Sequence, residues 1–257
     1  MKRMAFMLVA TSALLSGQAG GEVIDFESPT YTTTGGAGGT AQITGQDGWL
    51  NPVGGPEQAV IETTTVFNGS QSLRTSGDPD PTRYSTGSRT GVGGTDGSSV
   101  DWYARTSSTE IGTLLLFYFG TSTTDLSAAA VNVGIEKSRV NYRDGGTSLV
   151  SAANSIAADV WYHFTATLDF TNSQYDLAVE SVGLVSGDAG FLDFSATGLG
   201  FRNAAETDAT AVVVLSTTRD PEDYFVVDDI SFNAVPEPGA MTLLGLGGLA
   251  ILSSRKR

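Results

Sequence analysis

The sequence predicts an all-β protein: a two-sheet antiparallel β-sandwich flanked by an N-terminal helix and a short apolar C-terminal helix. Three observations predict this fold. Short runs rich in Val, Ile, Thr, Phe and Tyr recur about every 8 to 15 residues, separated by Gly, Asn, Asp and Ser. No stretch between the two ends shows helical periodicity. The length of 257 residues suits one large sandwich domain.

The N-terminus has the layout of a secretory signal peptide. Lys2 and Arg3 precede the apolar stretch Ala5–Leu15, and the small residues Gly17 and Ala19 follow it. A basic zone, an apolar zone and a small-residue zone in this order are typical of a cleavable signal. We expect residues 1–19 to be the signal, with a buried N-terminal helix as the alternative.

The body of the chain, residues 20–234, is expected to form one domain of about a dozen strands. Asn68-Gly69, Asp144-Gly145 and Asn172-Ser173 are turn dipeptides between apolar runs and predict local antiparallel links. Two Gly-rich segments, near Thr32 and over 76–99, are expected to be long surface loops. The expected strands cover 22–27, 59–64, 70–76, 99–106, 112–120, 129–136, 138–144, 147–152, 161–170, 175–182, 198–203, 210–216 and 224–232.

The clearest alternation lies in "WYHFTATLDF", residues 161–170. Alternate side chains of a strand point to opposite faces, so Tyr162, Phe164 and Leu168 are expected in the core. The pattern continues after the turn into 175–182. This hairpin is expected at the centre of the domain.

The opposite face of the same strand carries Trp161 and His163, and "DWYAR" presents Asp101 and Tyr103 in the same way. An aromatic ring can stack on the C–H groups of a sugar while polar neighbours bind its hydroxyls. These four residues are therefore candidate ligand-binding residues. The alternative is that they are ordinary sheet residues.

Asp228 shares its parity with Val226 and Ile230, which places a carboxylate on the core side of the last strand. Burying it unpaired would be costly. A β-bulge that turns it outward is one solution and hydrogen bonding to a loop is another. The third is a structural Ca²⁺ ion shared with Asp25 or Glu27 of the first strand. No other cofactor is expected.

The C-terminus combines three elements in order. Pro236, Glu237 and Pro238 precede the apolar segment Ala240–Leu252, and the chain ends in Arg255, Lys256 and Arg257. As a helix the apolar segment would span ~20 Å, less than the ~30 Å hydrocarbon core of a bilayer. Positive charge after it favours a cytoplasmic C-terminus. The segment is expected to be the chain's only contact with a membrane, and an ordinary tail anchor is the alternative.

This order of elements, over residues 235–257, resembles the PEP-CTERM sorting signal of Gram-negative bacteria. The resemblance implies recognition by an exosortase, a membrane-embedded cysteine protease, with removal of the helix and delivery to the cell surface. The prolines keep the backbone at this boundary extended and accessible. The expected location is thus transiently the inner membrane, then the cell surface or extracellular matrix.

The body itself resembles concanavalin A-like jelly rolls of the LamG and legume-lectin type. The resemblance rests on "WYHFTATLDFTNSQYDLAV", on "FNGSQSLR" and on the closing "YFVVDDISF". It implies a domain that engages glycans or is structural, here with extracellular polysaccharide as the expected partner. Galactose-binding-like jelly rolls share the "DFE" start and "DDISF" end and remain the competing fold.

Composition excludes several classes of function. With no cysteine, the chain has neither disulfides nor a cysteine zinc site. Its net charge of −14 gives no basic footprint for nucleic acid. It has one histidine and lacks the Glu-x-Asp-x-x-Glu spacing of laminarinase-like hydrolases. The expected function is therefore non-catalytic, structural or glycan-associating. The alternatives are a glycan-degrading enzyme and a protein-binding adhesin.

Overall fold

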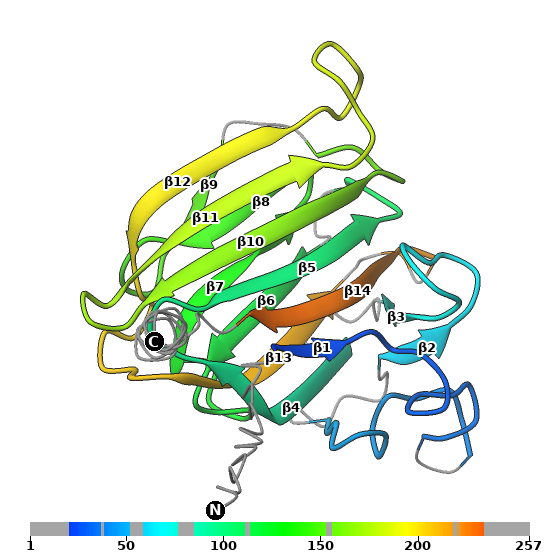
Figure 1. Ribbon diagram of the computed structural model, residues 1–257. Coiled ribbons are helices and arrows are strands. Elements are labelled where there is room, and N and C mark those ends of the chain that lie inside the picture. The colour runs from blue at the N-terminus through cyan, green and yellow to red at the C-terminus, as the bar shows by residue number, and fades with distance from the viewer. Residues whose placement is uncertain are drawn as a thin grey trace, which may run out of the picture.

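The computed structural model describes residues 21–36, 39–51, 59–76, 85–110, 114–152, 156–217, 220 and 222–233. Within these ranges the chain forms 14 strands and no helix (Figure 1). The two helices expected at the ends lie outside the described residues. The strands are β1 Glu22–Ile24, β2 Val60–Glu62, β3 Ser72–Ser76, β4 Ser85–Gly94, β5 Ser99–Thr106, β6 Leu114–Gly120, β7 Ala129–Glu136, β8 Arg139–Arg143, β9 Leu149–Ser151, β10 Trp161–Asp169, β11 Gln174–Ser181, β12 Asp193–Gly200, β13 Ala209–Thr217 and β14 Tyr224–Asn233.

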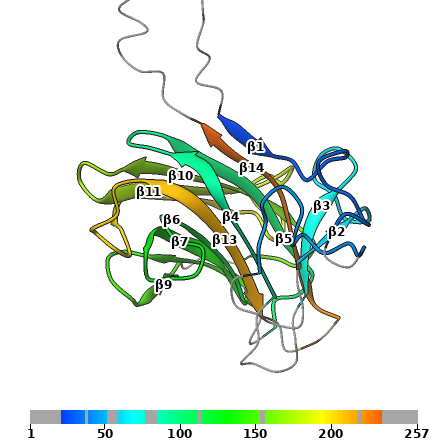
Figure 2. The same ribbon diagram turned by 90° about the horizontal axis from the view of Figure 1, so that it is seen from below.

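The strands build two antiparallel sheets that pack face to face (Figure 2). The eight-stranded sheet has the order β12-β11-β10-β5-β14-β3-β2, and β1 pairs with β14 beside this path. The six-stranded sheet has the order β4-β13-β6-β7-β8-β9. The predicted two-sheet antiparallel sandwich is confirmed. The first and last strands are neighbours, as expected of a jelly roll.

The core lies between the sheets and depends on strict alternation in β5 and β10. Trp102 of β5 is fully buried, and its ring stacks on Phe164 of β10 with centroids 5.1 Å apart. Phe117 of β6, in the opposite sheet, lies 4.9 Å from the same ring. Tyr162 and Leu168 are also fully buried, as their parity predicts. Aromatic side chains therefore join the two sheets.

The hairpin of β10 and β11 forms as predicted, but it is not the centre of the sheet. Two strands, β5 and β14, separate β10 from β3, so the middle of the eight-stranded sheet is built around β5 and β14. Alternation shows that a strand has one buried face and does not show which strands flank it. The pairing of β5 with β14 joins segments more than 100 residues apart, which no local pattern predicts.

The prediction of a loop over 76–99 is wrong for residues 85–94, because Ser85–Gly94 forms β4 and pairs with β13. Its Ser, Thr and Gly content is typical of a loop, but here small residues allow close packing. The fully buried ring of Trp49 lies over β4. A Cβ atom at Gly87 would come within 3.0 Å of its Cε3 atom. A larger side chain here would press on a ring that is distant in sequence, which favours glycine.

The predicted bounds of one strand are also wrong. The strand expected over 198–203 is β12, which runs from Asp193 to Gly200 and pairs with β11. It is an edge strand whose side chains are mostly exposed or half-buried. Weak burial leaves no strong apolar alternation in its first half, so the sequence pattern places it too late.

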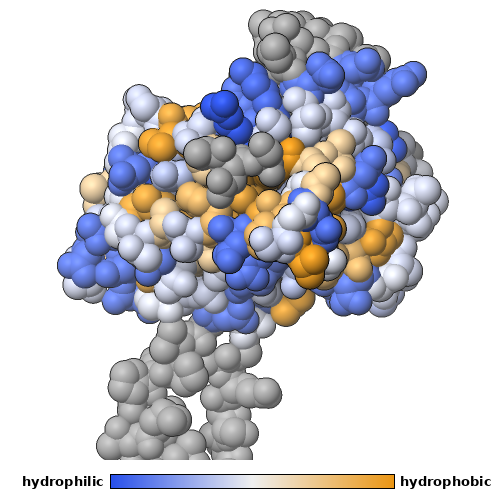
Figure 3. All heavy atoms as spheres, turned by 90° about the horizontal axis from the view of Figure 1, so that it is seen from above, coloured by the Kyte–Doolittle hydropathy of each residue, from blue (hydrophilic) through white to orange (hydrophobic). Residues whose placement is uncertain are grey.

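The end of the sandwich seen from above in Figure 3 exposes hydrophobic residues across its middle, with hydrophilic residues around them. The loop between β11 and β12 carries two of the exposed apolar side chains of the molecule, Val182 and Val185. Within the described ranges, no helix is long and apolar enough to span a membrane.

Candidate functional site

The pairing of β5 with β10 gathers the four predicted ligand-binding residues on one surface. Tyr103 lies opposite His163, and Trp161 lies opposite Arg105. Since Trp102 and Phe164 fill the core, the side chains that alternate with them project from the outer face of the eight-stranded sheet. Asp101 lies two residues from Tyr103 and shares that face.

A fifth residue, Phe67, completes an aromatic stack on this face. Phe67 belongs to the loop between β2 and β3, and its ring lies parallel to Tyr103 with centroids 3.7 Å apart. His163 stacks on Tyr103 at 4.6 Å. Trp161 meets Phe67 edge-on at 5.5 Å. We name Phe67, Tyr103, Trp161 and His163 the aromatic cluster. Phe67 and His163 stack on the Tyr103 ring, so Tyr103 holds its neighbours in place. Trp161 and His163 are half-buried and keep surface that a ligand could contact.

Asp101 is the polar centre beside the aromatic cluster. Its carboxylate accepts hydrogen bonds from Thr165 Oγ1 at 2.6 Å, Asn233 Nδ2 at 2.8 Å and Ser99 Oγ at 3.2 Å. His163 Nε2 lies 3.3 Å from Asp101 Oδ1. Burial disfavours the charged form, but these hydrogen bonds outweigh it and hold the pKa of Asp101 below its usual value. The carboxylate is thus ionised at neutral pH and fixed in place.

Asp101→Ala is expected to lower the free energy of unfolding at pH 7 by about 1–3 kcal/mol, because several donors lose a charged acceptor. Because folding lowers the pKa of Asp101, its ionised form stabilises the fold at pH values above the pKa of the unfolded state. This stabilisation is lost as the pH falls through the pKa of the folded state. The difference from wild type should therefore shrink below about pH 4. Urea unfolding at pH 7 and pH 3 measures it, with the exposed Glu222→Ala as control. Equal urea midpoints of Asp101→Ala and wild type at pH 7 would show that the hydrogen bonds to Asp101 do not stabilise the fold.

Charged groups border the aromatic cluster, one pair beside Trp161 and another on the side of β3 and β2. Arg105 Nη2 pairs with Asp159 Oδ1 at 2.7 Å. Arg74 lies over the Tyr224 ring at 4.2 Å, with its Nη1 atom 3.8 Å from Glu62 Oε2. Burial raises the pKa of Glu62, although attraction to Arg74 and Arg105 opposes the rise. Among the described residues, its buried Oε1 atom has no hydrogen-bond partner.

Asp228 fixes the loop that carries Phe67. Its Oδ2 atom accepts the backbone N–H groups of Phe67 at 3.0 Å and Asn68 at 3.2 Å, and Oδ1 accepts that of Asp229 at 2.9 Å. Between Asp228 and Ser231 the register against β5 shifts, and Asp229 has a φ of 47°. This bulge reverses the alternation, so Asp228 lies on the outer face under the loop. Its expected core-side position is wrong, and both the bulge and the loop hydrogen bonds are present.

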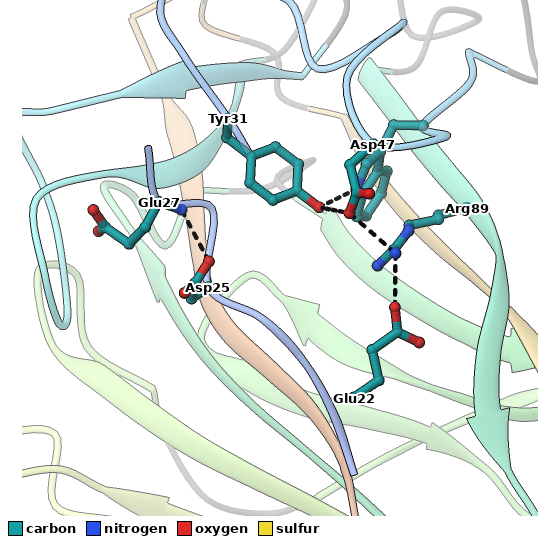
Figure 4. Close-up of polar contacts among 7 residues, drawn as sticks. Glu22, Asp25, Glu27, Tyr31, Asp47 and Arg89 are labelled. Atoms are coloured by element: carbon teal, nitrogen blue, oxygen red, sulfur yellow. Dashed lines mark hydrogen bonds and ion pairs between the residues drawn. The ribbon is translucent and has the colours of Figure 1, made fainter. Parts of the chain in front are cut away.

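The residues predicted to hold calcium are each occupied by protein donors. The Glu27 carboxylate accepts the N–H groups of Ser70 at 2.6 Å and Gln71 at 2.8 Å, and Asp25 Oδ1 accepts the N–H of Glu27 at 3.0 Å (Figure 4). Asp229, rather than Asp228, is their electrostatic neighbour: burial raises its pKa, and the charges of Asp25 and Glu27 add to the rise. In the part of the chain that the structure describes, no group of three or more acidic, His or Cys side chains is arranged to hold a metal ion.

The calcium hypothesis remains a prediction with a direct test. An ion bound only by the folded state would raise the melting temperature in saturating Ca²⁺ relative to EDTA. Asp25→Asn would abolish that rise, and Glu180→Gln, an exposed carboxylate elsewhere, would leave it unchanged. Identical melting temperatures with and without Ca²⁺ would reject a structural ion.

The sequence named Trp161, His163, Tyr103 and Asp101 as candidates on two separate segments, and the pairing of β5 with β10 brings them to one face. Phe67, Glu62 and Asp229 were not among the candidates. Phe67 directly precedes the Asn68-Gly69 turn, and an apolar residue at such a turn is the only local signal of a loop folded back on the sheet. Glu62 lies in a three-residue strand with too little pattern to orient it.

Comparison with known proteins addresses the two parts of the chain separately. Residues 234–257 match the family model of the PEP-CTERM protein-sorting motif. The predicted sorting motif is thereby confirmed, although its residues lie outside the described part of the structure. The motif implies an exported protein that is sorted at the membrane by an exosortase. The search of curated proteins returned no matching sequence.

The fold of the body matches solved structures at low sequence identity. A sialidase superposes with a TM-score of 0.50 and 13% identity over 84% of this chain and 18% of its own. Cellulose-induced protein Cip1 superposes with a TM-score of 0.50 and 14% identity over 83% of this chain and 97% of its own. The catalytic domain of a glycoside hydrolase family 131 protein from Coprinopsis cinerea superposes with a TM-score of 0.50 and 14% identity. The match covers 82% of this chain and 93% of that domain. These likenesses confirm the jelly-roll sandwich and concern the fold alone.

Proposed function

We propose that this exported protein is a non-catalytic, glycan-associating component of the extracellular layer, and that it binds polysaccharide on the outer face of the eight-stranded sheet. The observation that carries the proposal is the aromatic cluster beside Asp101. Half-buried Trp161 supplies an apolar ring to the C–H face of a sugar. Asp101 and Arg105 supply an acceptor and a donor for its hydroxyl groups.

The rigidity of the cluster supports a binding role. The Tyr103 ring is stacked against Phe67 and His163, and the Phe67 backbone is held by the buried Asp228 carboxylate. A preformed surface loses little conformational freedom when a ligand binds. The name of one structural neighbour, a glycoside hydrolase, refers to the same class of ligand.

Polysaccharide pulldown tests the proposal. Cellulose, chitin, laminarin and the producing bacterium's own extracellular polysaccharide serve as probes. At least one should retain the wild-type protein without releasing reducing ends. Trp161→Ala should lose most of this retention, and Val150→Ala, an exposed apolar change on β9 of the other sheet, should keep it. Full retention of Trp161→Ala would refute the site. Retention that soluble sugar does not compete away would indicate a protein-binding adhesin instead.

A glycan-degrading enzyme is the second candidate. Burial raises the pKa of Glu62, whereas hydrogen bonding lowers that of Asp101 on the same sheet. Carboxyl groups whose pKa values are pushed apart can act as acid and base in a glycosidase, where they lie within about 9.5 Å of each other. Here β14 and β3 lie between β5 and β2, so the two strands are about 14 Å apart and Glu62 and Asp101 do not form such a pair. Release of reducing ends that a single Asp or Glu substitution abolishes would establish an enzyme that uses other carboxylates.

The sorting half of the proposal has its own measurement. We propose that an exosortase-like protease removes the C-terminal segment and that the body then reaches the surface of a Gram-negative cell. The intact mass of the secreted form should lack residues 1–19 and the segment after the Pro236-Glu237-Pro238 region. A secreted form that retains Arg255, Lys256 and Arg257 would contradict this processing.

A further inference from the structure

A second apolar cluster lies on the outer face of the six-stranded sheet, away from the core between the sheets. β6 and β13 are adjacent, and they place Tyr118 opposite Val213 and Leu116 opposite Leu215. These four side chains are almost fully buried although they point away from the core. Continuous apolar runs such as "LLLFYF" are typical of strands covered on both faces. This face is therefore built to exclude water.

A cavity of about 300 Å³ opens in this cluster. Its apolar lining includes Leu116, Leu126 and Leu149. Between Leu116 of β6 and Asn141 of β8, the register places Gly134, which contributes no side chain to the face. The volume is at the small end of the range of ligand pockets, about 300–1,000 Å³. It suits a single ring or a short chain.

One charged side chain lines the cavity among these leucines. Arg143 lies opposite Leu149 at the end of β8, and the residue is only 9% exposed. Its Nε atom donates to Asn132 Oδ1 at 2.6 Å, and Asn132 donates in turn to the Phe117 carbonyl at 3.2 Å. The guanidinium is thus held in one orientation. Its Nη1 atom is buried and has no hydrogen-bond partner among the described residues.

Two arginines, Arg143 and Arg202, lie close enough to repel each other at this cavity of an acidic protein. The protein carries a net charge of −14, and Arg105 and Arg89 elsewhere pair with carboxylates. In the described ranges, neither Arg143 nor the nearby Arg202 forms an ion pair. Arg202 lies over the Tyr118 ring at 5.5 Å. Burial, with repulsion from Arg202, lowers the pKa of Arg143. A buried cation without a partner is unfavourable unless an anion reaches it.

We propose that this cavity binds a small monocarboxylate with an apolar body, its carboxylate accepting from Arg143 and its ring or chain packing against the leucines. A guanidinium presents N–H groups in a fork that matches a carboxylate. The leucine walls offer no partners for the many hydroxyls of a sugar, so this ligand differs in class from the glycan proposed for the other sheet. The two sites lie on opposite faces of the sandwich and are independent.

Isothermal titration of the full-length chain tests the proposal with matched probes. Hexanoate and benzoate should bind saturably. The alcohols 1-hexanol and benzyl alcohol keep the apolar chain or ring but lack the carboxylate charge, and they should bind at least about tenfold more weakly. Acetate, which lacks the body, should show no measurable binding. Arg143→Met should weaken hexanoate binding about tenfold or more without changing that of 1-hexanol. Arg139→Met, an exposed arginine of the same strand, should bind hexanoate as wild type does.

Leu149→Trp keeps Arg143 and fills the cavity with a larger side chain. This variant should bind neither hexanoate nor 1-hexanol. Equal affinity of wild type for hexanoate and 1-hexanol would overturn the role of Arg143. Undiminished binding in Leu149→Trp would place the ligand elsewhere. No saturable binding of either carboxylate at 10 mM would overturn the site itself. None of these outcomes bears on polysaccharide retention, so failure here and failure of the proposed function are distinguishable.

Discussion

Asp228→Ala is expected to lower the free energy of unfolding by about 3 kcal/mol at pH 5, because three backbone N–H groups lose a buried acceptor. The carboxyl group is fully buried and holds the N–H groups of Phe67 and Asn68. Its loss should also release Phe67 from Tyr103, so the effect reaches the aromatic cluster. Equilibrium urea unfolding measures the change, and the exposed Asp193→Ala serves as the matched control.

The same residue predicts a pH dependence. Burial raises the pKa of Asp228 to about 7 from an ordinary value of 3.8, although the N–H groups of Asn68 and Phe67 oppose the rise. The folded state therefore keeps a proton that the unfolded state releases. This stabilisation is complete below about pH 4 and is lost as pH rises through about 7, up to about 4 kcal/mol. Asp228→Asn cannot ionise, so its deficit relative to wild type should be largest in acid and smallest above pH 7. A deficit that grows with pH would contradict the raised pKa.

Trp102→Ala is the second large effect, with an expected loss of about 3–5 kcal/mol. The ring is fully buried and contacts aromatic side chains of both sheets: its centroid lies 5.1 Å from Phe164, 4.9 Å from Phe117 and 5.2 Å from Phe119. Alanine would leave a cavity that two opposed sheets cannot both close. Thermal and urea unfolding measure the loss.

Trp102→Phe separates packing from polarity at this site. Among the described residues, the Trp102 Nε1 atom is buried without a hydrogen-bond partner, so phenylalanine removes an unsatisfied donor. We expect a loss well below that of alanine, about 1–2 kcal/mol. Equal losses for the two variants would show that ring volume is not what Trp102 contributes.

The fold was predictable where one residue pattern determines one structural choice. Alternation in β10 placed Phe164 inward and Trp161 outward, and the Asn172-Ser173 turn fixed its partner β11. The same alternation in β5 brought Tyr103 and Asp101 to the outer face. Once β5 and β10 pair, the core of the candidate site follows from parity alone. These are local signals, and local signals are what a single sequence contains.

The remaining features depend on contacts distant in sequence. Phe67 reaches Tyr103 only because Asp228, about 160 residues later, binds its loop. Gly87 belongs to a strand because β4 pairs with β13, more than 100 residues later. The bulge at Asp229 changes the parity of β14 without any glycine or proline to mark it. In each case, the partner that decides the structure lies outside the window in which a pattern can be detected.

Tryptophan fluorescence tests directly whether Trp161 contacts glycan on the outer face of the eight-stranded sheet. The chain has three tryptophans, and Trp49 and Trp102 are fully buried, so a ligand at the surface can alter only Trp161. A saturating polysaccharide should shift emission to the blue and reduce acrylamide quenching. Trp161→Phe should show neither change. Polysaccharide retention with unchanged emission and quenching in wild type would contradict the account.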